Sequence, residues 1–199
     1  MLHTGIRVGE LAGMRPCDID GDTIHIQRTL AYRREGNGGY RYIVNPPKTS
    51  ASNRIFRLTR AAQRDLKDWY DVGQPAEPTC GIDDFIFSSQ LYHDSVGGKP
   101  LTHGTLGHIL KAAARVANQK YGADTIPENI SPHWLRHTFI CDAIDAGVPA
   151  TAVAALVGHE TETITMRVYY QCRPHVLEDA VDVLNEVFDG DDPRLHLVA

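Results

Sequence analysis

The chain has 199 residues, of which 42% are hydrophobic, so it can bury one sizeable core and we expect one domain. It has no apolar run of the roughly 18 residues that a membrane span requires, and its N-terminus lacks the layout of a signal peptide, which argues against a membrane protein and favours the cytoplasm. Its formal net charge of −5 counts against nucleic-acid binding, because proteins that bind nucleic acids usually carry a basic excess.

The negative charge is concentrated at the C-terminal end. Residues 174–199 hold seven acidic residues and one arginine, whereas the other 173 residues hold 19 basic and 18 acidic ones. A nearly neutral body can still present one basic face. The acidic end could stay off a nucleic acid, or it could cover the site when no nucleic acid is bound.

The first third of the chain predicts a short helix and a small sheet. Residues 8–14 have a helical pattern that stops before Pro16. Strand-like alternation occurs at residues 23–28, 40–44 and 54–59. The Pro, Ser and Asn residues of 46–53 predict a hairpin loop between the last two strands, with Lys48 at a strand edge or in that hairpin.

From residue 59 onwards the pattern is helical. We expect helices at residues 59–71, 104–120, 131–146, 149–157, 161–170 and 174–188. Ser131 can cap the third of these helices with Pro132 in its first turn, which places His133 near the helix N-terminus. The apolar stripe of the last helix would ordinarily pack on the core. Residues 189–199 have the composition of an acidic tail.

Phosphate-binding residue types stand near one predicted helix N-terminus. His133 and Arg136 lie at i and i+3, so both can contact one anion there. An arginine fork holds two non-bridging oxygens, and a phosphorane-like transition state needs a second arginine, for which Arg7 is the candidate. Taken alone, Arg7 and Glu10 would be an ordinary exposed ion pair.

Two adjacent tyrosines, Tyr169 and Tyr170, are candidate nucleophiles. A tyrosine hydroxyl is a weak nucleophile at neutral pH, because its ordinary pKa is about 10. It must lose its proton during attack, and it needs positive groups around it. Only one of the two can face a phosphate, because a helix turns about 100° per residue.

We expect no metal site. His133 and His137 have the H-x-x-x-H spacing of some zinc sites, but Trp134 stands where a zinc protease has glutamate, and no third ligand is evident. His137 is therefore expected to pack or to bond the backbone. The four cysteines include no C-x-x-C pair, which favours reduced thiols without disulfides.

Five motifs follow one another in the order that is typical of one family. They are Thr4-Gly5-Ile6-Arg7-x-x-Glu10, Pro47-Lys48-Thr49, His133-x-x-Arg136-His137, Gly158-His159 and Tyr169. Each motif alone recurs by chance. Together, across residues 4–171, they resemble the catalytic domain of the tyrosine recombinase, or phage integrase, family.

The resemblance implies a catalytic set of six residues. They are Arg7, Lys48, His133, Arg136, His159 and Tyr169. The two arginines and His159 would bind non-bridging oxygens of a phosphodiester, and Glu10 would orient the first arginine. Lys48 would protonate the 5′-oxygen leaving group. Tyr169 would attack, with Tyr170 as the alternative nucleophile, and His133 would be either a general base or a further phosphate ligand.

The resemblance also implies the fold and the activity. The fold would be mainly α with a small antiparallel β-sheet (α+β), of the DNA breaking-rejoining type. Such a domain cuts one strand of double-stranded DNA through a 3′-phosphotyrosyl intermediate and rejoins it without metal, cofactor or ATP. This chemistry serves DNA recombination and DNA integration in bacteria, phages and other mobile elements. Other protomers would complete a tetramer on DNA, and without DNA we expect a monomer or weak dimer.

The resemblance implies a division of the chain into two parts. Residues 1–188 would form the catalytic domain, and residues 189–199 its acidic tail. The family's N-terminal DNA-binding domain and first helix are absent from this chain, so we expect weak DNA affinity and little site preference. The family also suggests a second use for the helix at 174–188, which is docking on a neighbouring protomer.

Three alternatives stay open at this point. One alternative is a truncated, non-catalytic DNA-binding or regulatory remnant that keeps the fold. The net negative charge of the chain favours this alternative. Relaxation of DNA in the manner of type IB topoisomerases would use the same constellation of residues. A helical protein-interaction module would instead leave Arg7, Lys48, Arg136 and Tyr169 scattered over the surface.

Overall fold

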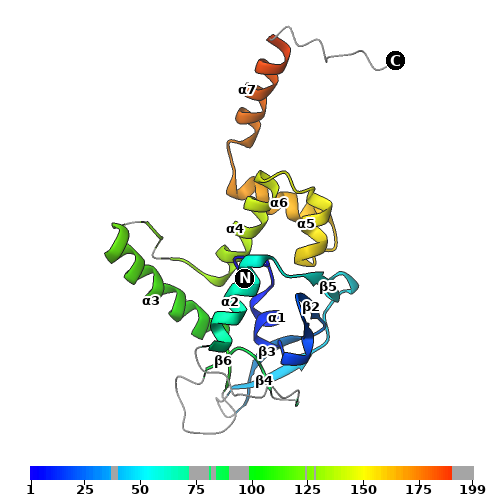
Figure 1. Ribbon diagram of the computed structural model, residues 1–199, viewed down its shortest axis with the longest axis vertical. Coiled ribbons are helices and arrows are strands. Elements are labelled where there is room, and N and C mark those ends of the chain that lie inside the picture. Colours follow the sequence, from blue (N-terminus) through cyan, green and yellow to red (C-terminus); the bar gives the residue numbers. More distant parts are fainter. Residues whose placement is uncertain are drawn as a thin grey trace.

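The computed structural model of the protein describes residues 1–36, 40–71, 81, 84–89, 99–123, 125–127 and 129–189 (Figure 1). Across these residues the fold is mainly helical with small antiparallel sheets, which confirms the predicted fold class. No helix of this described part is both long and apolar enough to cross a membrane. The predicted acidic tail lies outside the described residues, apart from Asp189.

The six helices predicted from residue 59 onwards are all present. They are α2 (Arg60–Asp71), α3 (His103–Tyr121), α4 (Pro132–Asp145), α5 (Ala150–Val157), α6 (Glu162–Cys172) and α7 (Val176–Asp189). The short helix predicted near the N-terminus is present as α1 (Val8–Ala12). Ser131 stands at the N-cap of α4 as predicted, although its side chain makes no capping hydrogen bond. Gly158 ends α5 with a φ of 71°, a left-handed conformation that glycine adopts without steric cost.

Small sheets occupy the first half of the chain and one later segment. Strands β1 (Ile19–Asp20), β2 (Thr23–Ile26) and β5 (Arg54–Arg57) form one antiparallel sheet in the order β1-β2-β5. Strands β3 (Thr29–Arg34) and β4 (Tyr40–Asn45) form a separate antiparallel hairpin, and β6 (Ser88–Ser89) pairs with β7 (Lys99–Pro100).

The predicted hairpin between the second and third strands is wrong. β4 pairs with β3, a strand that was not predicted, and β5 pairs with β2. Pro46 and Pro47 follow β4 directly and have no N–H to extend a ladder, and a 3₁₀ turn at Ser50–Ser52 then redirects the chain. Lys48 therefore lies in a connection between two sheets.

Two of the three buried apolar clusters in the described residues lie beside the start of α1. The first joins the β1-β2-β5 sheet to α1 and α2 through Ile6, Met14, Ile24, Ile26, Leu58, Ala62 and Ile86. The second joins α4 and α5 through Ile140, Val153 and Val157. Gly5 lies where they meet, with a φ of 62°, and a Cβ there would stand 2.5 Å from Phe139 and 2.7 Å from Val157. A small residue at position 5 thus lets the start of α1 lie against α4 and α5.

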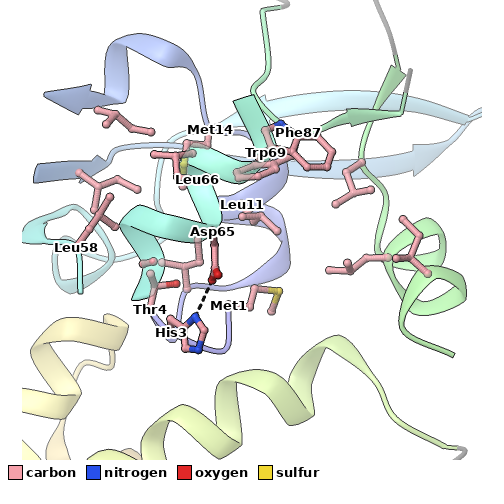
Figure 2. A pocket seen from close by; sticks show the side chains of 17 residues that line it. Met1, His3, Thr4, Leu11, Met14, Leu58, Asp65, Leu66, Trp69 and Phe87 are labelled. Carbon is pink, nitrogen blue, oxygen red and sulfur yellow. Dashed lines mark hydrogen bonds and ion pairs between the residues drawn. The ribbon is translucent and has the colours of Figure 1, made fainter. Parts of the chain in front are cut away.

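The first cluster leaves an apolar pocket of about 290 Å³ (Figure 2). Leu11 of α1 and Leu66 and Trp69 of α2 are among the residues that line it. His3 Nδ1 and Asp65 Oδ2, 2.6 Å apart, are hydrogen-bonded in its lining. None of the predicted catalytic residues, all of which the structure describes, lines this pocket.

Helix α7 extends away from the rest of the protein (Figure 1). Val181, Val183 and Leu184 are 54%, 58% and 48% exposed. These side chains therefore do not pack on the core, which is the ordinary expectation for an apolar stripe. They remain available for another surface.

The expectation of a chain without disulfides is wrong. Cys17, in a 3₁₀ turn at Pro16–Asp18, is disulfide-bonded. Cys141 on α4 and Cys172 on α6 are free thiols. No disulfide between these two cysteines therefore joins α4, which carries His133 and Arg136, to α6, which carries Tyr169.

Candidate active site

Arg7 lies at the N-cap of α1 and is held by two other parts of the chain. Its backbone N–H donates to Glu10 Oε2 at 2.9 Å, and its Nη1 donates to Glu10 Oε1 at 2.8 Å. Its Nη2 donates to the carbonyl oxygen of Gly158, which ends α5, at 2.7 Å. The side chain is still 37% exposed. The guanidinium is therefore fixed in direction and open to a ligand.

Glu10 is a buried carboxylate that is shared by two arginines. Arg54 of β5 binds both of its oxygens, with Nη1 to Oε1 at 3.1 Å and Nη2 to Oε2 at 3.0 Å. Burial acts to raise the pKa of Glu10, but the hydrogen bond and charge of Arg54, followed by those of Arg7, outweigh it and hold the pKa below its ordinary value. The exposed ion pair that spacing alone suggested is thus a buried network.

Arg136 is buried within α4, and both of its terminal nitrogens are bonded. Nη1 donates to the carbonyl oxygen of Gly5 at 2.5 Å, and Nη2 donates to that of Val157 at 2.9 Å. Burial, followed by the charge of Arg7, lowers the pKa of Arg136 to about 9, so the side chain stays charged at neutral pH. Arg136 therefore joins the segment before Arg7 to the end of α5.

Four of the six predicted catalytic residues line one groove of about 920 Å³. These residues are Arg7, Lys48, His133 and His159. They come from the start of α1, the connection between β4 and β5, the first turn of α4 and the turn between α5 and α6. Residues that are far apart in the sequence, among them the cationic Arg7 and Lys48, therefore meet at one surface, as an anion site requires. Arg7 and Lys48 thus share one groove, whereas a helical protein-interaction module would leave them apart on the surface.

His159 is a neutral imidazole in this groove. Its Nδ1 shares a hydrogen bond with Thr165 Oγ1 of α6 at 2.8 Å. Burial, followed by the charges of Arg136 and Arg7, lowers the pKa of His159 to about 4. Since Nδ1 is engaged, Nε2 is the ring nitrogen that a ligand in the groove can reach.

Tyr169 on α6 does not line the groove. Its hydroxyl donates to Asp145 Oδ1 at 2.9 Å, and Arg173 Nη2 donates to Asp145 Oδ2 at 2.7 Å. The hydrogen bond to Asp145 and the desolvation of the hydroxyl raise the pKa of Tyr169. Asp145 and His133 stand at opposite ends of α4, twelve residues or about 18 Å apart along its axis. The hydroxyl is thus held well away from the predicted phosphate site.

The neighbouring Tyr170 and the second histidine of α4 also lie outside the groove lining. Tyr170 is 49% exposed, with its ring centroid 5.9 Å from that of Tyr169. His137 is half-buried, and burial, followed by the charge of His133, lowers its pKa. Within the described part of the chain, no group of three His, Cys, Asp or Glu side chains is placed to hold a metal.

Sequence reasoning missed several residues that contact the predicted set, among them Arg54 and Asp145. Arg54 falls on the inward side of β5 together with Phe56, and a buried arginine needs a carboxylate partner. That alternation was the available signal for a second arginine in the site. Asp145 ends a helix and carries no local signal, because its bond to Tyr169 depends on the packing of α4 against α6.

The fold and the groove define the catalytic domain of a tyrosine recombinase. The solved Tn1549 transposon integrase in complex with transposon right end DNA superposes with a TM-score of 0.71 and 25% identity, over 95% of this chain and 56% of that one. The same integrase in complex with circular intermediate DNA gives a TM-score of 0.67 and 26% identity, over 84% of this chain and 52% of that one.

Sequence comparisons agree with the fold. The model of the phage integrase family matches residues 1–175, and the chain belongs to this family. The chain is 27% identical over 198 residues to a tyrosine recombinase XerC-like protein of Caldanaerobacter subterraneus subsp. tengcongensis, which covers 93% of this chain and 47% of that protein. It is 26% identical to the transposase from transposon Tn916 of Enterococcus faecalis, over 85% of this chain and 40% of that protein. The chain thus spans about half the length of such relatives or less.

Lowering the pH should reduce the stability of the folded protein through protonation of Glu10. Because the pKa of Glu10 is lower in the folded protein than in the unfolded chain, its contribution to stability is present above the unfolded pKa and is lost as pH falls through the folded one. We expect Glu10→Gln to cost about 3 kcal/mol at pH 7, since Arg54 loses its charged partner. The cost should shrink below about pH 4. Thermal denaturation of both proteins from pH 7 to pH 3 measures this, and an undiminished difference at pH 3 would contradict it.

Proposed function

We propose that this chain is the catalytic part of a site-specific DNA recombinase or integrase, which cuts and rejoins double-stranded DNA without metal or ATP. The observation that carries the proposal is the convergence of Arg7, Lys48, His133 and His159 on one groove. Membership of the phage integrase family supports the reaction class. A related Tn1549 integrase in complex with transposon DNA supports double-stranded DNA as the partner. We place this activity in the bacterial cytoplasm.

In the proposed reaction, the oxygen of Tyr169 forms a bond to phosphorus while the bond from phosphorus to the 5′-oxygen breaks. The phenolic proton passes to a base, for which His133 is the candidate, and Lys48 gives a proton to the departing 5′-oxygen. The 3′-phosphotyrosyl ester keeps a reactive phosphoester bond. A 5′-hydroxyl from a partner strand can therefore reverse the step and complete strand exchange.

The phosphate would be held by groups that are already in place. Arg7 offers an exposed, oriented fork, and neutral His159 offers Nε2 to a non-bridging oxygen. The terminal nitrogens of Arg136 are bonded to carbonyl oxygens, so in this conformation it would act through its charge. Direct contact between Arg136 and the phosphate would require one of those bonds to be exchanged.

The proposal requires the hydroxyl of Tyr169 to leave Asp145 and enter the groove. α6 follows directly after His159, so a movement of α6 when DNA occupies the groove could bring the tyrosine to the phosphate. The present arrangement would then be the form without DNA. In that form the carboxylate of Asp145 both holds the hydroxyl and keeps it protonated.

Releasing this contact should speed the reaction. We expect Asp145→Asn to raise the rate of covalent joining to DNA by up to about tenfold, because a hydrogen bond to a charged acceptor contributes about 1.5 kcal/mol. Asp142→Asn is the matched control, since Asp142 is 65% exposed and stands 3.8 Å from Arg173. The single-turnover rate of each variant decides the matter, and equal rates for both would contradict the prediction.

One experiment tests the proposed function. The 199-residue chain is incubated with duplex oligonucleotides that carry a randomised centre and a nick, so that the short strand released by cleavage diffuses away and the covalent product accumulates. Denaturing electrophoresis detects the product, and mass spectrometry identifies the residue that carries the nucleotide. Nucleotide on Tyr169 supports the proposal, and sequencing of the captured DNA gives the preferred site.

The same protein and DNA substrates distinguish two alternative functions. The bond from Tyr169 to Asp145 favours a non-catalytic DNA-binding or regulatory remnant, which would yield no covalent product at any DNA concentration. Relaxation like that of type IB topoisomerases would yield the product and would also relax supercoiled plasmid, without joining strands from two duplexes. Joining of two duplexes is therefore the result that distinguishes a recombinase.

We also propose how the chain assembles. Residues 1–188 would be the catalytic domain, and the exposed apolar residues of α7 would dock on a neighbouring protomer in a tetramer on DNA. Alone, the chain should be a monomer or weak dimer with weak affinity for DNA. A stable tetramer in light scattering without DNA, or a nanomolar gel-shift constant at physiological salt, would contradict this.

A further inference from the structure

Arg54 is the most extensively bonded buried side chain near the groove. Besides its two bonds to the carboxylate of Glu10, its Nε donates to the carbonyl oxygen of Leu156 at 2.7 Å, and its Nη1 donates to that of Ser52 at 3.2 Å. Its side chain is only 7% exposed, and it is not among the residues that line the groove. Its guanidinium therefore has little exposed surface to offer DNA in this conformation.

The guanidinium of Arg54 contacts both residues that bind the guanidinium of Arg7, which are Glu10 and Gly158. Glu10 binds Arg54 on one side and Arg7 on the other, and Gly158 accepts the bond from Arg7 Nη2. A Cβ at Gly158 would lie 2.6 Å from Arg54 Nη1, so the arginine packs directly against this glycine. The bond to Leu156 fixes the same turn from within α5.

We propose that Arg54 is a positioning residue for the phosphate-binding arginine, Arg7, and that it acts through Glu10 and the turn at residues 156–158. This inference rests on the proposed function. The physical reason is that one buried carboxylate is shared between two guanidinium groups. When Arg54 is present, it satisfies part of the charge of Glu10, and the fork of Arg7 keeps affinity for a phosphate.

Loss of the positive charge of Arg54 should lower catalysis rather than DNA binding. Arg54→Gln leaves Glu10 with Arg7 as its one charged partner, which draws the fork of Arg7 onto the carboxylate and away from the phosphate. We expect the single-turnover rate of covalent joining to fall about 10- to 100-fold, as for other outer-layer partners of an active site. The dissociation constant for duplex DNA should change by less than about twofold.

The chain offers a matched control on the same strand. Arg57 of β5 is paired with Asp22 and its side chain is 80% exposed, so it is not part of the buried network around Glu10. Arg57→Gln makes the same chemical change at the surface and should leave the rate of joining within about twofold of the unaltered protein. An equal loss of rate in both variants would overturn the proposal.

A double substitution separates positioning from general destabilisation. If Arg54 acts through Glu10, then Arg54→Gln with Glu10→Gln should join DNA at least about threefold faster than Arg54→Gln alone, since the unpaired carboxylate is gone. Independent contributions would make the double variant slower than either single one, and that result would overturn the proposal. Should Arg54→Gln fail to fold, Arg54→Lys keeps the charge but loses the two-point bond to Glu10 and the bond to Leu156, so its rate should lie below that of Arg57→Lys. Equal rates for these two lysine variants would overturn the proposal.

A spectroscopic readout makes the inference independent of cleavage. With ¹⁵N-labelled arginine, the Nε–H signal of Arg7, assigned from Arg7→Lys, should shift in Arg54→Gln and stay unchanged in Arg57→Gln. A shifted signal in a protein that never joins DNA would retain the positioning role and reject the proposed function. An unshifted signal would reject the positioning role, whatever the activity.

Discussion

Tyr169→Phe should abolish covalent joining of the protein to DNA and leave the fold intact. The substitution removes the one oxygen that can form the phosphotyrosyl bond, so the loss should reach the detection limit of the capture experiment. The ring stays in its buried position, and only the hydrogen bond to Asp145 is lost, which costs about 1–2 kcal/mol of stability. Denaturing electrophoresis and thermal denaturation measure the two effects.

Tyr170→Phe is the control for this result. Tyr170 adjoins Tyr169 on α6 and is 49% exposed, so the same loss of a hydroxyl should leave the rate of joining nearly unchanged. The reverse pattern, with activity lost in Tyr170→Phe and kept in Tyr169→Phe, would make Tyr170 the nucleophile. Joining by neither the unaltered protein nor any variant would favour the non-catalytic remnant.

Arg7→Lys should lower the rate of joining about 10²- to 10³-fold, because one oriented donor to the transition-state oxygens is lost. Lysine keeps the charge but has no planar fork, so it cannot hold Glu10, Gly158 and a phosphate oxygen at the same time. The change is measured as a single-turnover rate at saturating DNA. The loss of rate in Arg7→Lys should exceed that in Arg54→Gln, since Arg54 acts through Glu10 and not on the phosphate itself.

Arg57→Lys provides the comparison at an exposed position of β5. Its rate should match that of the unaltered protein, and its DNA affinity should fall no more than that of Arg7→Lys. A loss of DNA affinity in Arg7→Lys that accounts for the whole loss of rate would show that Arg7 contributes binding and not catalysis.

The sequence predicted the helices and the family well, and the sheet less well. The capping and helix-stop signals around residues 59–71, 131–146 and 149–157 are local, and those helices are present. The strand β3 was missed and the strand pairing was wrong, because pairing depends on which segments meet in space. The prolines at 46 and 47 fit a hairpin loop, but they also prevent the two flanking strands from extending one ladder.

Motif order alone pointed to the residues of the groove, and four of the six predicted catalytic residues converge there. Their roles remain proposals. The sequence did not reveal that Glu10 is buried between Arg7 and Arg54, or that Asp145 binds the hydroxyl of Tyr169. The contact of Glu10 with Arg54 and that of Asp145 with Tyr169 join residues 44 and 24 positions apart, so no helical or strand period can indicate them.

The sequence by itself determined the family, the order of the helices and the chemical types available at the site, because these depend on local patterns and on motifs in a fixed order. Tertiary structure decided which charges share a partner and where the tyrosine points. The reason is physical: the pKa of a buried carboxylate, and the direction of a hydroxyl, are set by the groups packed around them. In this protein those groups are Arg7 at the N-cap of α1 and Arg54 of β5 for Glu10, and Asp145 of α4 for Tyr169.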